Sequence, residues 1–157
     1  MNELNRRCVF RAAIAAILCG TWVPLPLPAS AGDPAPASPR VAIEGYDPVA
    51  YFTDGRPVKG SPTFSFPFDD AVYYFASAEH QKMFAADPDR YAPQYAGYCA
   101  AAASAGMKVE ANPKFWAISG GRLYVFYGEE GNARFAEDSA GLIAKADAHW
   151  RVLKDQR

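Results

Sequence analysis

The chain has few of the residues that form disulfides or bind metal ions. Its 157 residues include three cysteines, three methionines and two histidines. Cys8 and Cys19 belong to a predicted leader, so Cys99 is the only cysteine of the remaining chain. A single cysteine excludes an internal disulfide, and in an oxidising compartment it must be buried, paired with another molecule or used in chemistry.

The sequence also lacks a run of basic residues. The net charge is -1, from 16 basic and 17 acidic residues. Removing the predicted leader leaves 13 and 16, which makes the net charge -3. Binding a nucleic acid backbone needs a basic surface, so we expect no nucleic acid partner. No phosphate-binding glycine loop or hydrolase arrangement is recognisable either.

Residues 1–31 are typical of a secretory signal peptide. Three arginines precede an apolar stretch of 12 residues, Ala12 to Val23, and Ala29-Ser30-Ala31 forms an A-x-A cleavage site. The stretch is too short to cross a bilayer, so we expect no membrane span. A periplasmic or secreted location is predicted, by the general secretory route in preference to the twin-arginine route.

Residues 32–40 are rich in proline, alanine and serine and are predicted to be an extended linker. The following 117 residues, 41–157, have the size of one ordinary domain. We expect this segment to fold without disulfides, around a core rich in aromatic rings.

Two β-hairpins are predicted in this domain. Residues 63–68 alternate phenylalanine with other residues and are followed, after Asp69-Asp70, by residues 71–76. Residues 114–119 and 122–127 flank Gly120-Gly121, which suits a tight hairpin turn. Helices are predicted at about 78–86, 98–105 and 140–153. The fold class is therefore α+β, with two antiparallel hairpins forming a small sheet covered by three or more helices.

The two hairpin units resemble each other. A shift of 51 positions superimposes several identical residues: Tyr73 on Tyr124, Phe75 on Phe126, Glu79 on Glu130, Phe84 on Phe135 and Asp87 on Asp138. The pattern indicates an internal duplication. Chance similarity between two hairpin–helix units is the alternative.

Cys99 is predicted to lie in the first turn of the 98–105 helix. A helix N-terminus stabilises a thiolate, the form that binds metals and attacks electrophiles. Burial among alanines would instead make the thiol a packing residue, and the sequence favours neither interpretation. Further metal-ligand candidates are His80, His149, Met83 and Met107, none at a recognised spacing from Cys99.

Three segments resemble the exported YHS-domain family: GYDPVAYF (45–52), YYFASAEHQKMFAADPDRYAPQY (73–95) and GYCA (97–100). More distant YHS domains bind metal through cysteines in DPVCGM-like and FCSxxC-like segments. Here Ala50 and Ala76 stand at cysteine positions, and His80 stands near the last one. The resemblance therefore implies a YHS-like domain over 41–157, in which any metal site would use Cys99, with His80 as a possible second ligand.

The leading hypothesis is an exported small protein that binds a metal ion, copper before zinc, through a free thiolate at Cys99 and through His80. One alternative is a thiol-based redox enzyme that uses Cys99. The other is a scaffold that binds a protein partner and buries Cys99. The balance of these observations is against an enzyme, and no catalytic residue is assigned.

Overall fold

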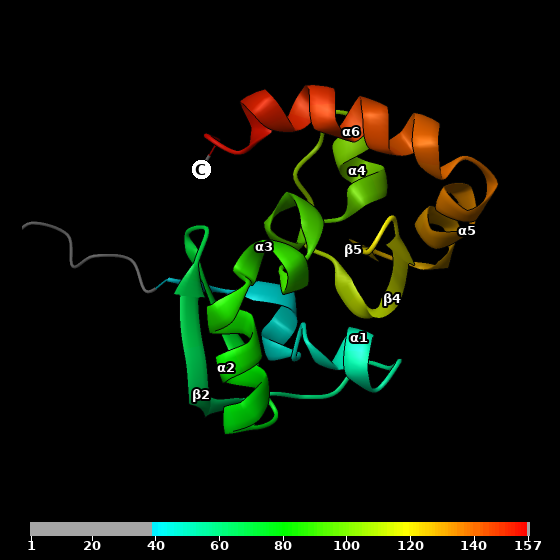
Figure 1. The fold of residues 1–157 in the computed structure, drawn as a ribbon. Coiled ribbons are helices and arrows are strands. Elements are labelled where there is room, and N and C mark those ends of the chain that lie inside the picture. Colours follow the sequence, from blue (N-terminus) through cyan, green and yellow to red (C-terminus); the bar gives the residue numbers. More distant parts are fainter. Residues whose placement is uncertain (1–38, 157) are drawn as a thin grey trace, which may run out of the picture. The chain divides into compact units, whose positions relative to one another are not determined.

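The computed structural model describes residues 39–156 (Figure 1). The predicted signal peptide and residues 32–38 of the predicted linker lie outside this range. The first half contains β1 (Arg40–Val41), η1 (Ala42–Gly45), α1 (Ala50–Thr53), β2 (Ser61–Phe68), β3 (Ala71–Phe75), α2 (Ala78–Ala86) and α3 (Pro88–Tyr91). The second half contains η2 (Gln94–Gly97), α4 (Ala100–Ser104), β4 (Asn112–Ser119), β5 (Arg122–Phe126), α5 (Glu129–Glu137) and α6 (Ser139–Leu153).

Both predicted hairpins are present, but they belong to separate sheets. β2 pairs antiparallel with β3, and β4 pairs antiparallel with β5. The first sheet has the strand order β1-β3-β2, because the short β1 pairs parallel with β3 on the side away from β2. The mixed helix and strand composition is confirmed, whereas the hairpins form two small sheets and not one.

The predicted helices are found, and two of them have changed bounds. α2 spans the predicted 78–86, and the hydroxyl of Ser77 caps it by accepting the backbone N–H of His80 at 3.1 Å. α6 begins one residue before the predicted 140, after the Asp138 cap. α4 is shorter than the predicted 98–105, because Cys99 has an extended backbone and serves as the N-cap.

The structure repeats with the period found in the sequence. Shifting β2, β3 and α2 by 51 positions reproduces the bounds of β4, β5 and α5. The register shift in the first hairpin, between Ser61 and Ser65, recurs between Asn112 and Trp116. These coincidences confirm that the two halves are copies of one unit.

Each half is built around one phenylalanine of its helix. Phe84 of α2 lies 5.0 Å from the ring of Tyr73 and 5.1 Å from that of Phe75, measured between centroids. The equivalent Phe135 of α5 lies 5.0 Å from the ring of Tyr124 and 5.2 Å from that of Phe126. All six rings are buried, so the same aromatic contacts hold a helix against a hairpin in each half.

Each half also contains a left-handed turn. Ile43, Glu44 and Gly45 in η1 have φ values of 42°, 51° and 73°. In η2, 52 positions later, Tyr95, Ala96 and Gly97 have φ values of 57°, 51° and 78°. Such a run is unusual outside glycine and is kept only where the surrounding structure enforces it. The chain then leads from each turn to a short helix through Asp47 in one half and Cys99 in the other.

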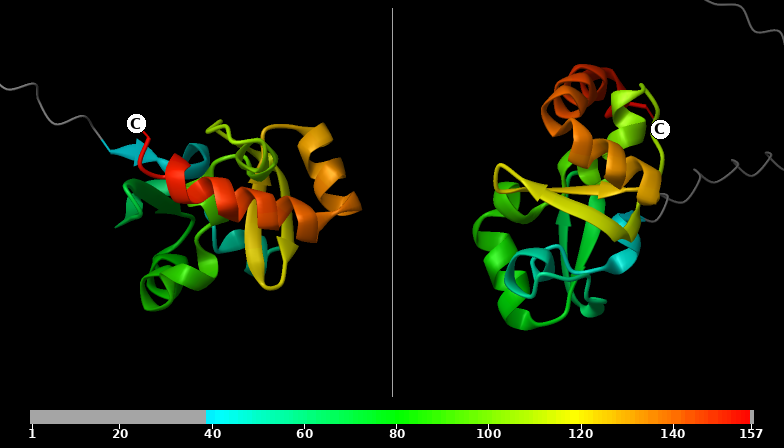
Figure 2. Two further views of the ribbon diagram at one scale, coloured as in Figure 1. Left: turned by 90° about the horizontal axis from the view of Figure 1, so that it is seen from above. Right: turned by 90° about the vertical axis from the view of Figure 1, so that its right-hand side faces the viewer.

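The second half ends in the long helix α6 (Ser139–Leu153), whereas the equivalent stretch of the first half forms only the short α3 (Pro88–Tyr91). In Figures 1 and 2, α6 lies over α4, whereas α2 lies beside β2. In Figure 1, α2 and α4 are well separated, because α4 lies under α6 and α2 lies on the side of the first hairpin. This separation decides which predicted site residues can meet.

Candidate functional site

Asp47 is a fully buried carboxylate at the start of α1. Its Oδ1 accepts the backbone N–H groups of Val49 at 2.8 Å and Ala50 at 3.4 Å. Its Oδ2 accepts the backbone N–H of Ala76 at 2.8 Å and lies 2.6 Å from Nδ1 of His80. The exposed fraction of Asp47 is 0%. A buried carboxylate is tolerated when donors satisfy it, and this one has four.

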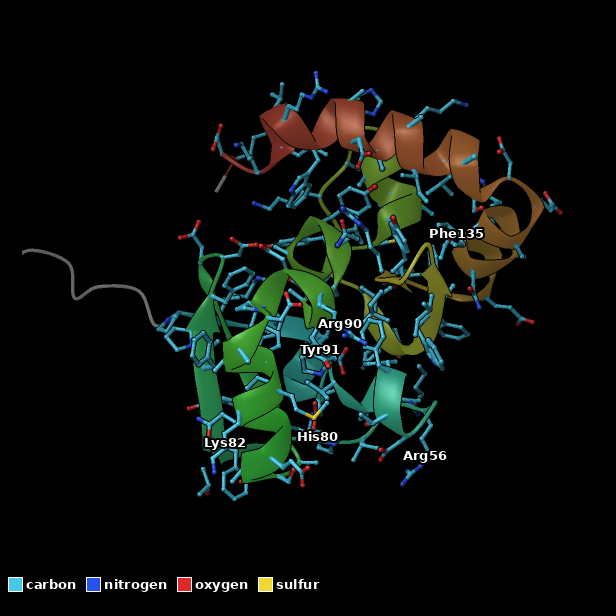
Figure 3. The ribbon with its side chains drawn as sticks, in the orientation of Figure 1. Arg56, His80, Lys82, Arg90, Tyr91 and Phe135 are labelled. Atoms are coloured by element: carbon cyan, nitrogen blue, oxygen red, sulfur yellow. The ribbon has the colours of Figure 1, made fainter. Side chains whose placement is uncertain are left out.

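His80 lies on α2 with its side chain 17% exposed (Figure 3). A carboxylate that already accepts three backbone N–H groups acts as an acceptor, so Nδ1 carries the hydrogen shared with Asp47. Nε2 lies 3.4 Å from Oγ1 of Thr53, whose hydroxyl has a closer partner in Asp54 Oδ1 at 2.8 Å. Asp47 thereby fixes the tautomer and the plane of the imidazole, and Nε2 has only a weak partner.

Cys99 lies where the sequence placed it, at the start of a short helix. Its backbone N–H donates to the carbonyl of Val109 at 2.8 Å, and Sγ accepts the N–H of Ala102 at 3.4 Å. The residue is only 3% exposed. The packing interpretation of the free thiol therefore gains support, because a metal ion or an oxidant would have little access to Sγ.

Asp47 and Cys99 are equivalent positions, 52 residues apart, and they make equivalent contacts. The backbone N–H of Asp47 donates to Val58, as that of Cys99 does to Val109. Both side chains accept the N–H of the residue three positions later. The partner of Asp47 has no counterpart, since Gly131 replaces His80 in the second half. A Cβ at Gly131 would lie 3.1 Å from Cβ of Ala101, so α4 occupies the space of an imidazole.

The structure does not bring Cys99 and His80 together through any polar contact within residues 39–156. His80 contacts Asp47 and Thr53 from α2, whereas Cys99 caps α4 in the other half. In the same part of the chain, no group of three or more His, Cys, Asp or Glu side chains is arranged to hold a metal ion. Within this part of the chain, the side chains of Cys99 and His80 therefore have separate polar partners.

The other ligand candidates lie on three different segments, and Met83 follows His80 on the same helix. His149 on α6 is exposed and its Nδ1 lies 3.2 Å from the carbonyl of Ala103, beside α4. Met107 is 54% exposed in the loop after α4, and Met83 of α2 packs against the core. His80 is the one candidate whose ring is oriented by a buried carboxylate.

A second feature is a cleft of about 820 Å³, which we name the Tyr98 cleft. It is lined by Asp69 and Asp70 of the β2–β3 turn, Tyr98, Lys108, Trp150 and Lys154. Its volume is within the range of about 300–1,000 Å³ that is usual for small-molecule sites. The centroids of the Tyr98 and Trp150 rings are 5.9 Å apart, and Nζ of Lys108 lies 5.0 Å from the first and 5.9 Å from the second.

Arg40 closes one side of this cleft. Its guanidinium lies 4.2 Å from the centroid of the Tyr98 ring, forms an ion pair with Glu110 at 3.0 Å and donates to the carbonyl of Ala96. Burial, opposed by the charge of Arg40, raises the pKa of Tyr98, so its phenol stays neutral. Two cations of the protein, Arg40 and Lys108, thus lie over the aromatic rings of the cleft.

Replacing Asp69 with asparagine is expected to stabilise the protein at neutral pH by a few tenths of a kcal/mol. Burial, followed by the negative charges of Asp89 and Asp70, raises the pKa of Asp69. The ionised carboxylate therefore costs stability above its folded-state pKa, and the cost disappears as the pH falls below the unfolded value of about 3.9. Urea unfolding of both proteins at neutral pH and near pH 3 measures this. An equal difference at both pH values would contradict it.

Comparison with known proteins does not extend these observations. Neither a family model, a curated protein nor a solved structure matches the chain. Among residues 39–156, no helix has the length and apolar character needed to cross a membrane.

Sequence reasoning missed Asp47 and the Tyr98 cleft as functional features. The repeat contained a signal for Asp47, because a shift of 52 positions, one more than the shift of the hairpins, aligns the segments GYD and GYC and so pairs Asp47 with Cys99. The cleft has no local signal, because its walls come from the β2–β3 turn, the residues around α4 and the end of α6.

Proposed function

We propose that the chain is an exported binding protein for a metal ion, copper before zinc, and that His80 is the protein ligand. The Asp47–His80 pair is the observation that carries this proposal. A histidine that binds a metal through one nitrogen commonly donates its other ring N–H to a carboxylate, which orients the ring and raises its basicity. His80 meets that description, with Nδ1 held at 2.6 Å from Asp47.

The donor chemistry favours copper and zinc. Imidazole nitrogen suits both ions, whereas the hard ions calcium and magnesium prefer clusters of oxygen ligands. Within residues 39–156, His80 does not belong to any group of three or more His, Cys, Asp or Glu side chains that could hold a metal ion. The remaining coordination positions are therefore assigned to water or to donors of another molecule, which suits a protein that carries a metal ion and gives it up.

Export belongs to the same proposal and is supported by the signal-like residues 1–31. The resemblance to YHS domains supports it as well, because His80 stands near a metal-binding cysteine position of that family. The thiol-based redox function and the scaffold function are not favoured by a comparable observation. The 3% exposure of Cys99 supports packing as its role.

Replacing His80 with glutamine is expected to weaken Cu(I) and Zn(II) binding by about tenfold or more, because the oriented imidazole nitrogen is lost. Cu(I) affinity is measured by competition with a chromophoric chelator under reducing conditions, and Zn(II) affinity by calorimetry. His149 is the only other histidine of the chain and is exposed. The matched control is therefore His149→Gln, which should bind as the unchanged protein does.

Cys99→Ser completes this experiment by separating the two predicted ligands. Since Sγ is buried, we expect the serine variant to bind copper and zinc with unchanged affinity. Equal affinities for the unchanged protein and His80→Gln would contradict the proposal. A loss seen only in Cys99→Ser would place the metal at the thiol and contradict the role of His80.

A further inference from the structure

The Tyr98 cleft has equal numbers of cationic and anionic side chains, and most of them form no ion pair. With Arg40 and Asp155 included, its lining carries three cationic and three anionic side chains. Within residues 39–156 the ion pairs are Arg40–Glu110 and Asp47–His80, so neither aspartate of the β2–β3 turn and neither lysine of the cleft forms one there. Charged groups that form no ion pair in a concave site can bind a ligand that carries the complementary charges.

The two sides of the cleft carry opposite excess charge: Asp69 and Asp70 outnumber Arg40, which pairs with Ala71 beside them, and Lys108 and Lys154 outnumber Asp155. Asp69 and Asp70 form the tight turn between β2 and β3, with φ values of 48° and 58°, so their backbone is fixed. In Figure 1 this turn faces the C-terminal end of α6, which supplies Lys154. Lys108 is held in place, since Nζ donates to the carbonyl of Gln156 at 2.5 Å and lies over both aromatic rings.

The lining of the cleft also includes two aromatic rings. Tyr98 and Trp150 are both partly exposed, and their rings are tilted at 45° to each other. Their exposed ring surface offers contact to an apolar group. A large polyanion is disfavoured because the aspartates repel it, and a simple cation is disfavoured because Arg40 and Lys108 already lie over Tyr98.

We propose that the Tyr98 cleft binds a small zwitterion, namely an amino acid or a short peptide with free termini. Its ammonium group lies toward Asp69 and Asp70, its carboxylate lies toward Lys108 and Lys154, and its apolar side chain rests on Tyr98 and Trp150. This site shares no residue with the Asp47–His80 pair, so it is independent of metal binding at His80.

The test compares four forms of the tripeptide alanyl-phenylalanyl-alanine by calorimetry: with free termini, N-acetylated, C-amidated and capped at both ends. The purified full chain should bind the free form most tightly. Each single cap should weaken binding by about three- to tenfold, because it removes one exposed charge pair. The doubly capped form should bind weakest. Equal binding of all four forms, or no binding of the free form, would overturn the proposal.

Two pairs of substitutions assign the two ends. In Lys108→Met with Lys154→Met, amidation should no longer weaken binding, while acetylation still should. In Asp69→Asn with Asp70→Asn, the pattern should be reversed. Lys82 of α2 is exposed and does not line the cleft, so Lys82→Met is the control and should bind like the unchanged protein (Figure 3). Circular dichroism verifies that each variant is folded. If amidation weakens binding equally with and without the two lysines, the proposed orientation is wrong.

Discussion

Replacing Asp47 with alanine is expected to lower the free energy of unfolding by about 3–5 kcal/mol. The carboxylate is fully buried and accepts the N–H groups of Val49, Ala50 and Ala76. Alanine accepts none of them, so three backbone donors lose their side-chain partner and the ring of His80 loses its anchor. Denaturant unfolding followed by circular dichroism measures the change.

Two substitutions calibrate this result. Asp54→Ala removes a carboxylate that is exposed to solvent and should lower the free energy of unfolding by less than about 1 kcal/mol. Cys99→Ala alters the equivalent position of the second half, where the side chain accepts one weak hydrogen bond, and should cost about 1 kcal/mol. A cost for Asp47→Ala as small as that for Cys99→Ala would show that the four donors are not held by the carboxylate in solution.

A second variant at this position, Asp47→Asn, links stability to the proposed function. Asparagine has nearly the same size as aspartate but has an NH2 group in place of one carboxylate oxygen. The imidazole of His80 then loses its charged partner, and metal affinity should fall along with stability. His80→Gln removes one of the four contacts, so it should cost less stability than Asp47→Ala while removing more metal binding.

Much of the local structure follows from the sequence, because hairpins and amphipathic helices have local signals. The alternating phenylalanines before Asp69-Asp70 and the glycine pair at 120–121 predicted both hairpins. Ser77 and Pro88 predicted the limits of α2 closely. The separation into two sheets could not be predicted, since β1 has only two residues and no periodicity. Nor could the left-handed turn at Ile43, because a β-branched residue disfavours a φ of 42°.

The candidate site was predictable only in part. Cys99 was correctly placed at a helix start, because glycine and alanine mark that helix in the sequence. The contact between His80 and Asp47 spans 33 positions and depends on how α2 packs on the first hairpin, which no local pattern encodes. The duplication explains why chemistry could diverge between the halves. One half has a carboxylate and an imidazole, while the other has a thiol and a glycine at the equivalent positions.

Replacing Gly60 with alanine is expected to destabilise the protein by about 3 kcal/mol or more, because the added methyl group has no space. A Cβ at this position would lie 2.5 Å from the carbonyl carbon and 2.6 Å from the carbonyl oxygen of Tyr74, and 2.7 Å from the nitrogen of Phe75. These are backbone atoms of β3, so no side-chain rotation relieves the contact. The chain must move at Gly60, which donates to the carbonyl of Gly45, or in β3.

A movement of β3 should also change the geometry of the Asp47–His80 pair. Ala76, which follows Phe75 directly, donates its N–H to Asp47, so a shift of β3 alters the carboxylate that orients His80. We therefore expect Gly60→Ala to weaken metal binding as well as stability, measured by unfolding and by chelator competition. Gly128→Ala is the matched control, since a Cβ there meets nothing within 4 Å and should change stability by less than about 1 kcal/mol. Similar stability losses in the two variants would mean that Gly60 is not needed for the close approach to β3.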